Sequence, residues 1–192
     1  SFRSRPALPP PEIPPMTDVA ALERYLDLYA DYLGTLGTDA AALAQLVESD
    51  LPRDARARVI SALNYVFKSV DLIPDGIDDI GFLDDAFVVR VAAKLAVDAG
   101  GSGGDLARLA GEAADIASFL EADHVRLENY VQGLRRSEAR GRTVDDVLDD
   151  AAIRAEFLTE VAAWSAAYEI PSFTKQPKTL VKLKAFLSAK LP

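Results

Sequence analysis

The chain has 192 residues, of which 49% are hydrophobic and 27% are charged. This is enough for one globular domain of roughly 150 residues with flanking segments. The chain has no cysteine and a single histidine. Disulfides, thiolate metal sites and cysteine nucleophiles are therefore excluded, and histidine-based metal sites and catalytic triads are disfavoured. No apolar run reaches the ~18 residues of a membrane-spanning helix and no secretory signal is recognisable, so we expect a cytoplasmic protein.

The charge balance is acidic, with 21 basic and 30 acidic side chains and a formal net charge of −9. Such a balance disfavours binding to nucleic acid through many phosphate contacts. The charges are unevenly distributed, because residues 171–192 contain no acid and five lysines: Lys175, Lys178, Lys182, Lys184 and Lys190. We therefore expect an acidic body followed by a basic C-terminal segment.

The first half of the chain begins with a proline-rich stretch and continues with helical patterns. Residues 1–15 contain six prolines, which predicts a disordered, polyproline-like arm over residues 1–16. From residue 17, apolar residues recur every three or four positions, as in amphipathic helices. We expect the first helix to end at Gly34 and Gly37 and a second to follow to about residue 49. A third helix should begin near Pro52 and stop at Pro74, and a fourth should carry Phe87 to Leu95.

The second half also reads as helical. A seven-residue apolar rhythm from residue 105 to about 136 predicts one helix about 45 Å long at 1.5 Å per residue. Thr143 is a candidate N-cap for a helix that begins at Val144, and a further apolar stripe ends at Pro171. The last helix should run from Lys178 to Lys190. With no strand pattern, the sequence predicts an all-α fold, a single bundle of six or seven helices. It comprises an all-α domain over residues 17–170 and a lysine-rich C-terminal helix in 171–192.

The most distinctive segment is residues 69–85, which read SVDLIPDGIDDIGFLDD and lie between two apolar helices. It resembles the YkvA-like family of bacterial domains of unknown function (DUF1232), and the resemblance covers about residues 53–97. It implies a helical hairpin at the centre of the bundle and no established activity. Gly76 to Asp79 stand where the family has an apolar pair, which makes this connector more acidic. The positions that carry the resemblance are Asp71, Leu72, Ile73, Pro74, Asp75, Gly81, Phe82, Leu83, Asp84 and Asp85.

Six aspartates lie within residues 71–85, which contain no basic side chain. One interpretation is a site for Mg²⁺ or Ca²⁺, since these ions prefer oxygen ligands; its ligands would be Asp71, Asp75, Asp84 and Asp85. The structural interpretation, which we favour, makes these aspartates turn and helix-start residues, with neighbouring Lys68, Arg90 and Lys94 balancing part of their charge. A third interpretation is an acidic face for a partner. Gly81 should supply a positive φ between the two halves of the motif.

The C-terminal helix offers two further interpretations. Its lysines, Lys178, Lys182, Lys184 and Lys190, accompany a leucine stripe, as in helices that bind anionic membranes or partners. The alternative, which we favour, is that the leucines dock on the bundle while the lysines face its acidic body.

No nucleophile with an adjacent base is recognisable in the sequence. The sequence therefore favours the interpretation that the protein is a non-enzymatic interaction or regulatory module that binds another protein. Two alternatives remain: a divalent-metal protein, with or without hydrolytic activity, and a peripheral membrane protein held by residues 178–191.

Overall fold

The computed structural model describes residues 19–68 and 71–192, so the proline-rich arm lies outside the described residues. An all-α fold is confirmed, and the described part of the chain holds eight α-helices rather than six or seven. They are α1 (Val19–Val47), α2 (Arg53–Tyr65), α3 (Leu83–Asp98), α4 (Gly104–Leu120), α5 (Asp123–Gly133), α6 (Val144–Asp149), α7 (Ala151–Ala167) and α8 (Pro177–Lys190). A 3₁₀ turn, η1 (Leu134–Arg136), precedes a two-residue antiparallel pair, β1 (Glu138–Ala139) and β2 (Arg142–Thr143).

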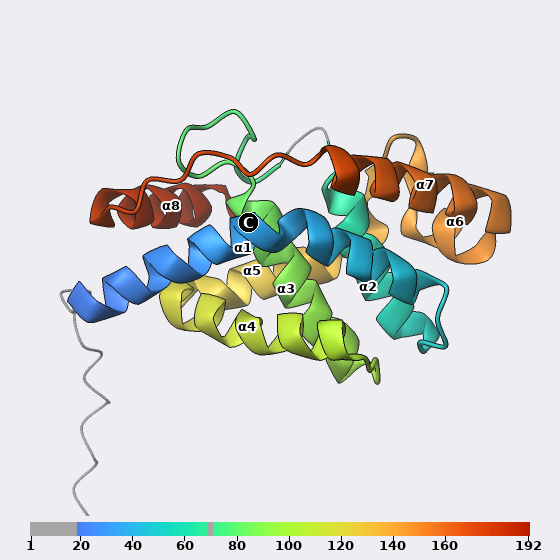
Figure 1. Ribbon diagram of the computed structural model, residues 1–192. Coiled ribbons are helices and arrows are strands. Elements are labelled where there is room, and N and C mark those ends of the chain that lie inside the picture. Colours follow the sequence, from blue (N-terminus) through green and yellow to red (C-terminus); the bar gives the residue numbers. More distant parts are fainter. Residues whose placement is uncertain (1–18, 69–70) are drawn as a thin grey trace, which may run out of the picture.

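Helix α3 is the centre of the bundle. Nearly all of its residues are buried, and it contacts α1, α2, α4 and α5. Figure 1 shows α1 running along the bundle in front of α3, with α7 and α8 in the upper layer at opposite ends. Between them lie the described parts, residues 66–68 and 71–82, of the segment that joins α2 to α3, which we call the connector. No helix in the described ranges combines the length and hydropathy needed to cross a bilayer.

Helix α1 is one continuous helix, so the prediction of a break at Gly34 and Gly37 was wrong. Gly37 is buried where α7 reaches α1, and a Cβ there would lie 3.0 Å from Cδ1 of Tyr168 and 3.2 Å from the carbonyl oxygen of Ser165. The glycine therefore permits two helices to approach closely. Local sequence does not distinguish a glycine that permits close helix packing from a glycine that ends a helix.

The single helix expected over residues 105–136 is also wrong, because the chain turns between α4 and α5. Glu121 has a φ of 54°, which interrupts the helix. Leu120 and Leu127, on either side of the turn, are both buried in the same core. The seven-residue apolar repeat thus continues across two helices. The repeat indicates which residues face the core, but it does not indicate whether the helix axis is straight.

The remaining boundaries follow local signals. Thr143 caps α6 as predicted: its side chain accepts a hydrogen bond from the backbone N–H of Asp146, and the Asp146 side chain accepts one from the Thr143 N–H. Asp150 then caps α7, accepting from the N–H groups of Ala152 and Ile153. This second cap separates the short helix α6 from α7.

Helix α8 confirms the predicted C-terminal helix and docks on the bundle through Leu180, Leu183 and Leu187, which are fully buried. Its lysines differ in their surroundings. Lys184 pairs with Glu121 at 2.7 Å, and the Lys182 ammonium donates to the carbonyl oxygen of Asp78 at 2.8 Å. Lys178 and Lys190 are exposed.

Candidate functional site: the carboxylate elbow and its groove

The carboxylate elbow, formed by Asp71, Asp75, Asp84 and Asp85, lies where the connector enters α3. Helix α2 ends at Tyr65, well before Pro74, which was predicted to stop it. Leu72, Ile73 and Ile80 of the connector are buried in the core. The connector is therefore anchored by apolar side chains while part of its acidic surface remains accessible.

Gly81 has a different role from the predicted one. The positive φ angles belong to Asp79 (71°) and Phe82 (63°), and Gly81 does not have one. A Cβ on Gly81 would lie 2.2 Å from the carbonyl oxygen of Asp75. The motif requires glycine here because two stretches of backbone touch, which leaves no space for a side chain.

Asp84 joins the three parts of the hairpin. Its Oδ2 accepts hydrogen bonds from the Tyr65 hydroxyl at 2.7 Å and from the Ile73 N–H at 3.0 Å. The Tyr65 hydroxyl in turn accepts a bond from the Leu72 N–H at 2.9 Å. Although Asp84 is in the first turn of α3, its side chain thus ties the end of α2 to the connector.

Three carboxylate oxygens at the elbow are buried and have no hydrogen-bond partner among the described residues: Oδ1 of Asp71, Oδ1 of Asp84 and Oδ2 of Asp85. Asp84 and Asp85 are 0% and 2% exposed. Burial, reinforced by the charges of Asp84 and Asp75, raises the pKa of Asp71 to about 7. Burial also raises the pKa of Asp84 to about 6 and that of Asp85 well above its usual range. Burial therefore moves the titration of these carboxyls toward neutral pH, well above that of an exposed aspartate.

The four aspartates are neighbours without forming a ligand shell. Over residues 19–68 and 71–192, no group of three His, Cys, Asp or Glu side chains is placed to hold a metal ion. Asp75 is exposed and Asp71 half-buried, whereas Asp84 and Asp85 belong to the core. The Mg²⁺ or Ca²⁺ site at these residues stays a prediction.

Arg90 and Lys94, which were expected to balance the charge of the elbow aspartates, form ion pairs with other carboxylates. Arg90 is buried and pairs with Asp39 at 3.2 Å and Glu112 at 2.7 Å. Lys94 pairs with Asp98 at 2.6 Å. Lys68 remains close enough to lower the pKa of Asp71 somewhat, against the larger effect of burial. The elbow is thus left with little positive charge to balance it.

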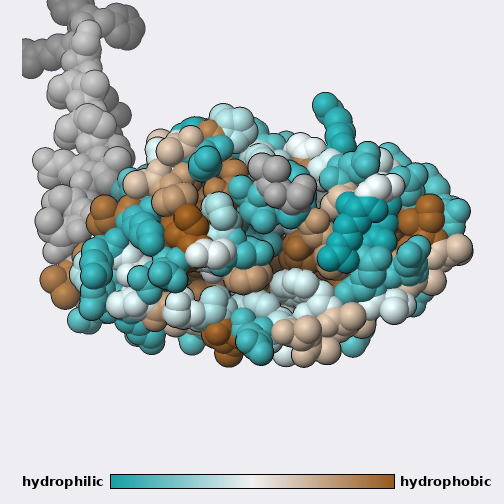
Figure 2. All heavy atoms as spheres, turned by 90° about the horizontal axis from the view of Figure 1, so that it is seen from above, coloured by the Kyte–Doolittle hydropathy of each residue, from teal (hydrophilic) through white to brown (hydrophobic). Residues whose placement is uncertain are grey.

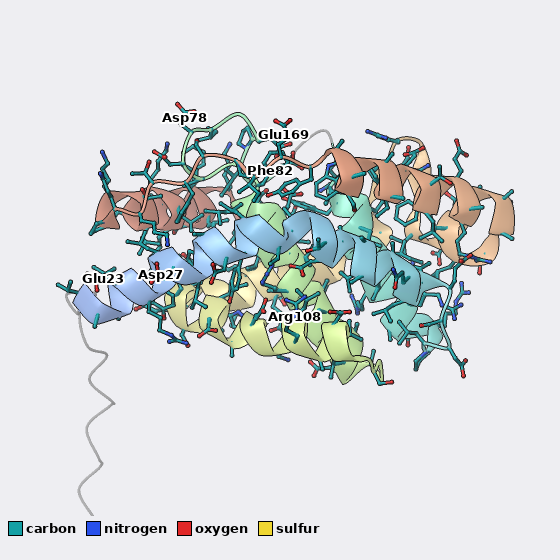
Figure 3. The ribbon with its side chains drawn as sticks, in the orientation of Figure 1. Glu23, Asp27, Asp78, Phe82, Arg108 and Glu169 are labelled. Atoms are coloured by element: carbon teal, nitrogen blue, oxygen red, sulfur yellow. The ribbon has the colours of Figure 1, made fainter. Side chains whose placement is uncertain are left out.

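A groove of about 410 Å³ adjoins the elbow, and the sequence did not reveal it. We call it the aromatic groove; it is lined by Phe82, Trp164, Ala167, Tyr168, Glu169, Ile170 and Pro171. The Tyr168 ring lies 5.7 Å from that of Phe82 and 5.3 Å from that of Trp164. Figure 3 shows Phe82 and Glu169 close together at the top of the bundle, and Figure 2 looks down on this side, where apolar patches alternate with polar side chains.

Tyr168 connects the aromatic groove to the elbow. Its hydroxyl donates to the carbonyl oxygen of Leu33 at 2.8 Å, which fixes the ring against α1. Burial and the charges of Asp85 and Asp75 raise the pKa of Tyr168. The groove is therefore apolar inside and acidic on its elbow side. Trp164 and Tyr168 are both half-buried and line the groove.

The fold and the elbow together define an all-α protein built around a helical hairpin with a partly buried carboxylate cluster. Residues 55–90 match the family described as "Protein of unknown function (DUF1232)". The match confirms the resemblance over α2, the connector and the first half of α3. Searches of the curated proteins and of the solved structures find no significant match.

Proposed function

We propose that the chain is a non-enzymatic protein-interaction module whose binding face is the aromatic groove together with the exposed side of α7. The observation that carries this proposal is the composition of α7. Only Phe157 and Val161 of this helix are buried, yet its exposed side is also rich in apolar residues. The exposed alanines are Ala151, Ala152, Ala155, Ala162, Ala163, Ala166 and Ala167. A surface helix normally confines its apolar residues to the stripe that faces the core.

The groove gives this surface a point of attachment. Its volume falls within the range of ordinary binding pockets, roughly 300–1,000 Å³. Ile170, at its edge, is 65% exposed. Asp75 and Glu169 add exposed carboxylates beside the aromatic rings. An apolar recess with an acidic rim suits a peptide segment that carries apolar and basic side chains.

Selection from a displayed peptide library against the full chain tests the proposal. The variant Ile170→Asp places a charge at the groove, and Val125→Asp is a matched control on α5, because Val125 is 61% exposed. We expect the wild type and Val125→Asp to enrich the same peptides and Ile170→Asp to lose them, with unchanged helix content by circular dichroism. Failure to enrich any peptide family, or equal enrichment by Ile170→Asp, would contradict the proposal.

A further inference from the structure

We infer that the aromatic groove binds an arginine side chain of the partner segment, with the guanidinium stacked on an aromatic ring and paired with Glu169. This inference rests on the function proposed above and names the chemical group that the groove recognises. A combination of aromatic ring, carboxylate and arginine occurs at two places inside the folded chain, and the groove offers the same ring and carboxylate.

Helix α7 already binds two arginines in this way. The guanidinium of Arg140 lies 4.4 Å from the centre of the Phe67 ring and pairs with Glu160 of α7 at 3.0 Å. Arg142 lies 5.2 Å from the centre of the Phe157 ring, also on α7, and pairs with the same Glu160 at 2.5 Å. Each guanidinium therefore interacts with an aromatic ring and a carboxylate together.

A second example lies in the core of the bundle. The guanidinium of Arg90 lies 3.7 Å from the centre of the Tyr32 ring and pairs with Glu112 at 2.7 Å. The lysine ammonium groups that lie over rings in the described part of the chain are farther away, at 5.3 to 5.8 Å. A planar guanidinium can stack flat on a ring while its N–H groups donate to a carboxylate, whereas an ammonium acts as a point charge. The combination of ring and carboxylate therefore favours arginine.

The aromatic groove provides the rings and the carboxylate. Tyr168 is the middle ring of the three, because it contacts both Phe82 and Trp164. All three rings are half-buried, so each keeps part of its surface accessible. Glu169 is exposed and lines the same groove, and Figure 3 shows it close to Phe82. Within residues 19–68 and 71–192, no cation lies over any of these rings and Glu169 has no ion pair.

The charge around the groove also favours a cation. None of the residues that line it is basic. Burial, and then the charges of Asp85 and Asp75, raise the pKa of the Tyr168 hydroxyl, which places the rings within the field of the elbow carboxylates. This field attracts a cation to the ring faces and repels an anion. A guanidinium in the groove is therefore stabilised by the elbow as well as by Glu169.

Three blocked tripeptides, Leu-X-Leu with arginine, lysine or citrulline as X, test the inference through the fluorescence of Trp164, the only tryptophan of the chain. Citrulline has the shape of arginine but no charge. We expect the arginine peptide to change the fluorescence of the full chain in a saturable way. The lysine peptide should bind about tenfold more weakly, since it cannot stack and pair at once. The citrulline peptide should give no saturable change.

The variant Glu169→Gln keeps the size of the side chain and removes the paired carboxylate, so it should weaken binding of the arginine peptide by about fivefold or more. Glu156→Gln is the matched control, because Glu156 is exposed on α7 and does not line the groove. Both variants lose one negative charge, but the control should bind the peptide as the wild type does. Circular dichroism checks that the helix content of both variants is unchanged.

The inference would be overturned by equal binding of the arginine peptide and either of the other two, by the absence of a saturable change with any peptide, or by an unaltered affinity in Glu169→Gln. This failure is distinguishable from failure of the proposed function. A library selection that enriches peptides without arginine would leave the interaction function standing and remove the assignment of arginine. A selection that enriches no peptide family would contradict the function itself.

Discussion

The Tyr65 hydroxyl donates a 2.7 Å hydrogen bond to Oδ2 of Asp84, and both side chains are fully buried. Nineteen residues separate them in the sequence, and the connector between them contributes the N–H groups of Leu72 and Ile73 to the same network. The angle between α2 and α3 is therefore held by polar contacts inside an apolar core, where a missing partner is costly.

Replacing Tyr65 with Phe should destabilise the fold by about 3 kcal/mol, because Asp84 loses a donor and the Leu72 N–H loses its acceptor. Urea unfolding followed by circular dichroism measures this change. Tyr130→Phe is the control: its hydroxyl accepts only from Lys68, at 3.1 Å, at a part-buried position. That change should cost less than ~1 kcal/mol. An equal decrease in the free energy of unfolding in both variants would show that the hydrogen bonds of Tyr65 stabilise the fold no more than that of Tyr130 does.

Stability should decrease as the pH rises from about 5 to 8. The pKa of Asp71 is raised to about 7 and that of Asp84 to about 6, against about 3.9 for an unfolded aspartate. Between these values the folded state binds more protons than the unfolded state, so unfolding becomes easier as the pH increases. Thermal melting at successive pH values measures the effect.

The variant Asp71→Asn isolates one contribution to this slope, because it removes a titrating group whose pKa is raised first by burial and then by Asp84 and Asp75. Its melting temperature should vary less with pH than that of the wild type over the same range. Asp145→Asn is the control, since its pKa is lowered by Arg135 and it stays ionised throughout that range. A wild-type slope of the opposite sign, or one unchanged in Asp71→Asn, would contradict this prediction.

Gly81→Ala should destabilise the hairpin by about 3 kcal/mol or more, because the added Cβ meets the carbonyl oxygen of Asp75 and the backbone has to move. Gly76→Ala, in the same connector, places its Cβ where no atom lies within 4 Å. It should change the free energy of unfolding by less than ~1 kcal/mol. Urea titration of the two variants measures these free energies of unfolding. If Gly81→Ala were as stable as the wild type, the close contact between Gly81 and the Asp75 carbonyl oxygen would be refuted.

The divalent-ion hypothesis makes its own prediction. Millimolar Mg²⁺ or Ca²⁺ should raise the melting temperature of the wild type, since binding to the folded state alone stabilises it. The double variant Asp75→Asn with Asp84→Asn should lose the shift. Asp78→Asn, at an exposed position of the same connector, should retain it. A flat response of the wild type to both ions would exclude the hypothesis.

The peripheral-membrane hypothesis requires α8 to leave the bundle, because its leucines are covered in the folded protein. We therefore expect the full chain to stay in the supernatant when mixed with anionic liposomes at about 0.15 M salt. Pelleting that high salt reverses, and that Lys178→Glu with Lys190→Glu abolishes, would instead support membrane attachment through this helix.

The sequence by itself determined the helical class, the cap at Thr143, the leucine face of α8 and the hairpin motif. These features depend on periodicity and on contacts between near neighbours, which a local pattern records. Only the tertiary structure decided that Gly37 lies in a helix crossing, that Gly81 meets the backbone of Asp75, and that Phe82 joins Trp164 and Tyr168 around a groove. Each of these depends on which distant segments pack together, and spacing along the chain does not encode that pairing.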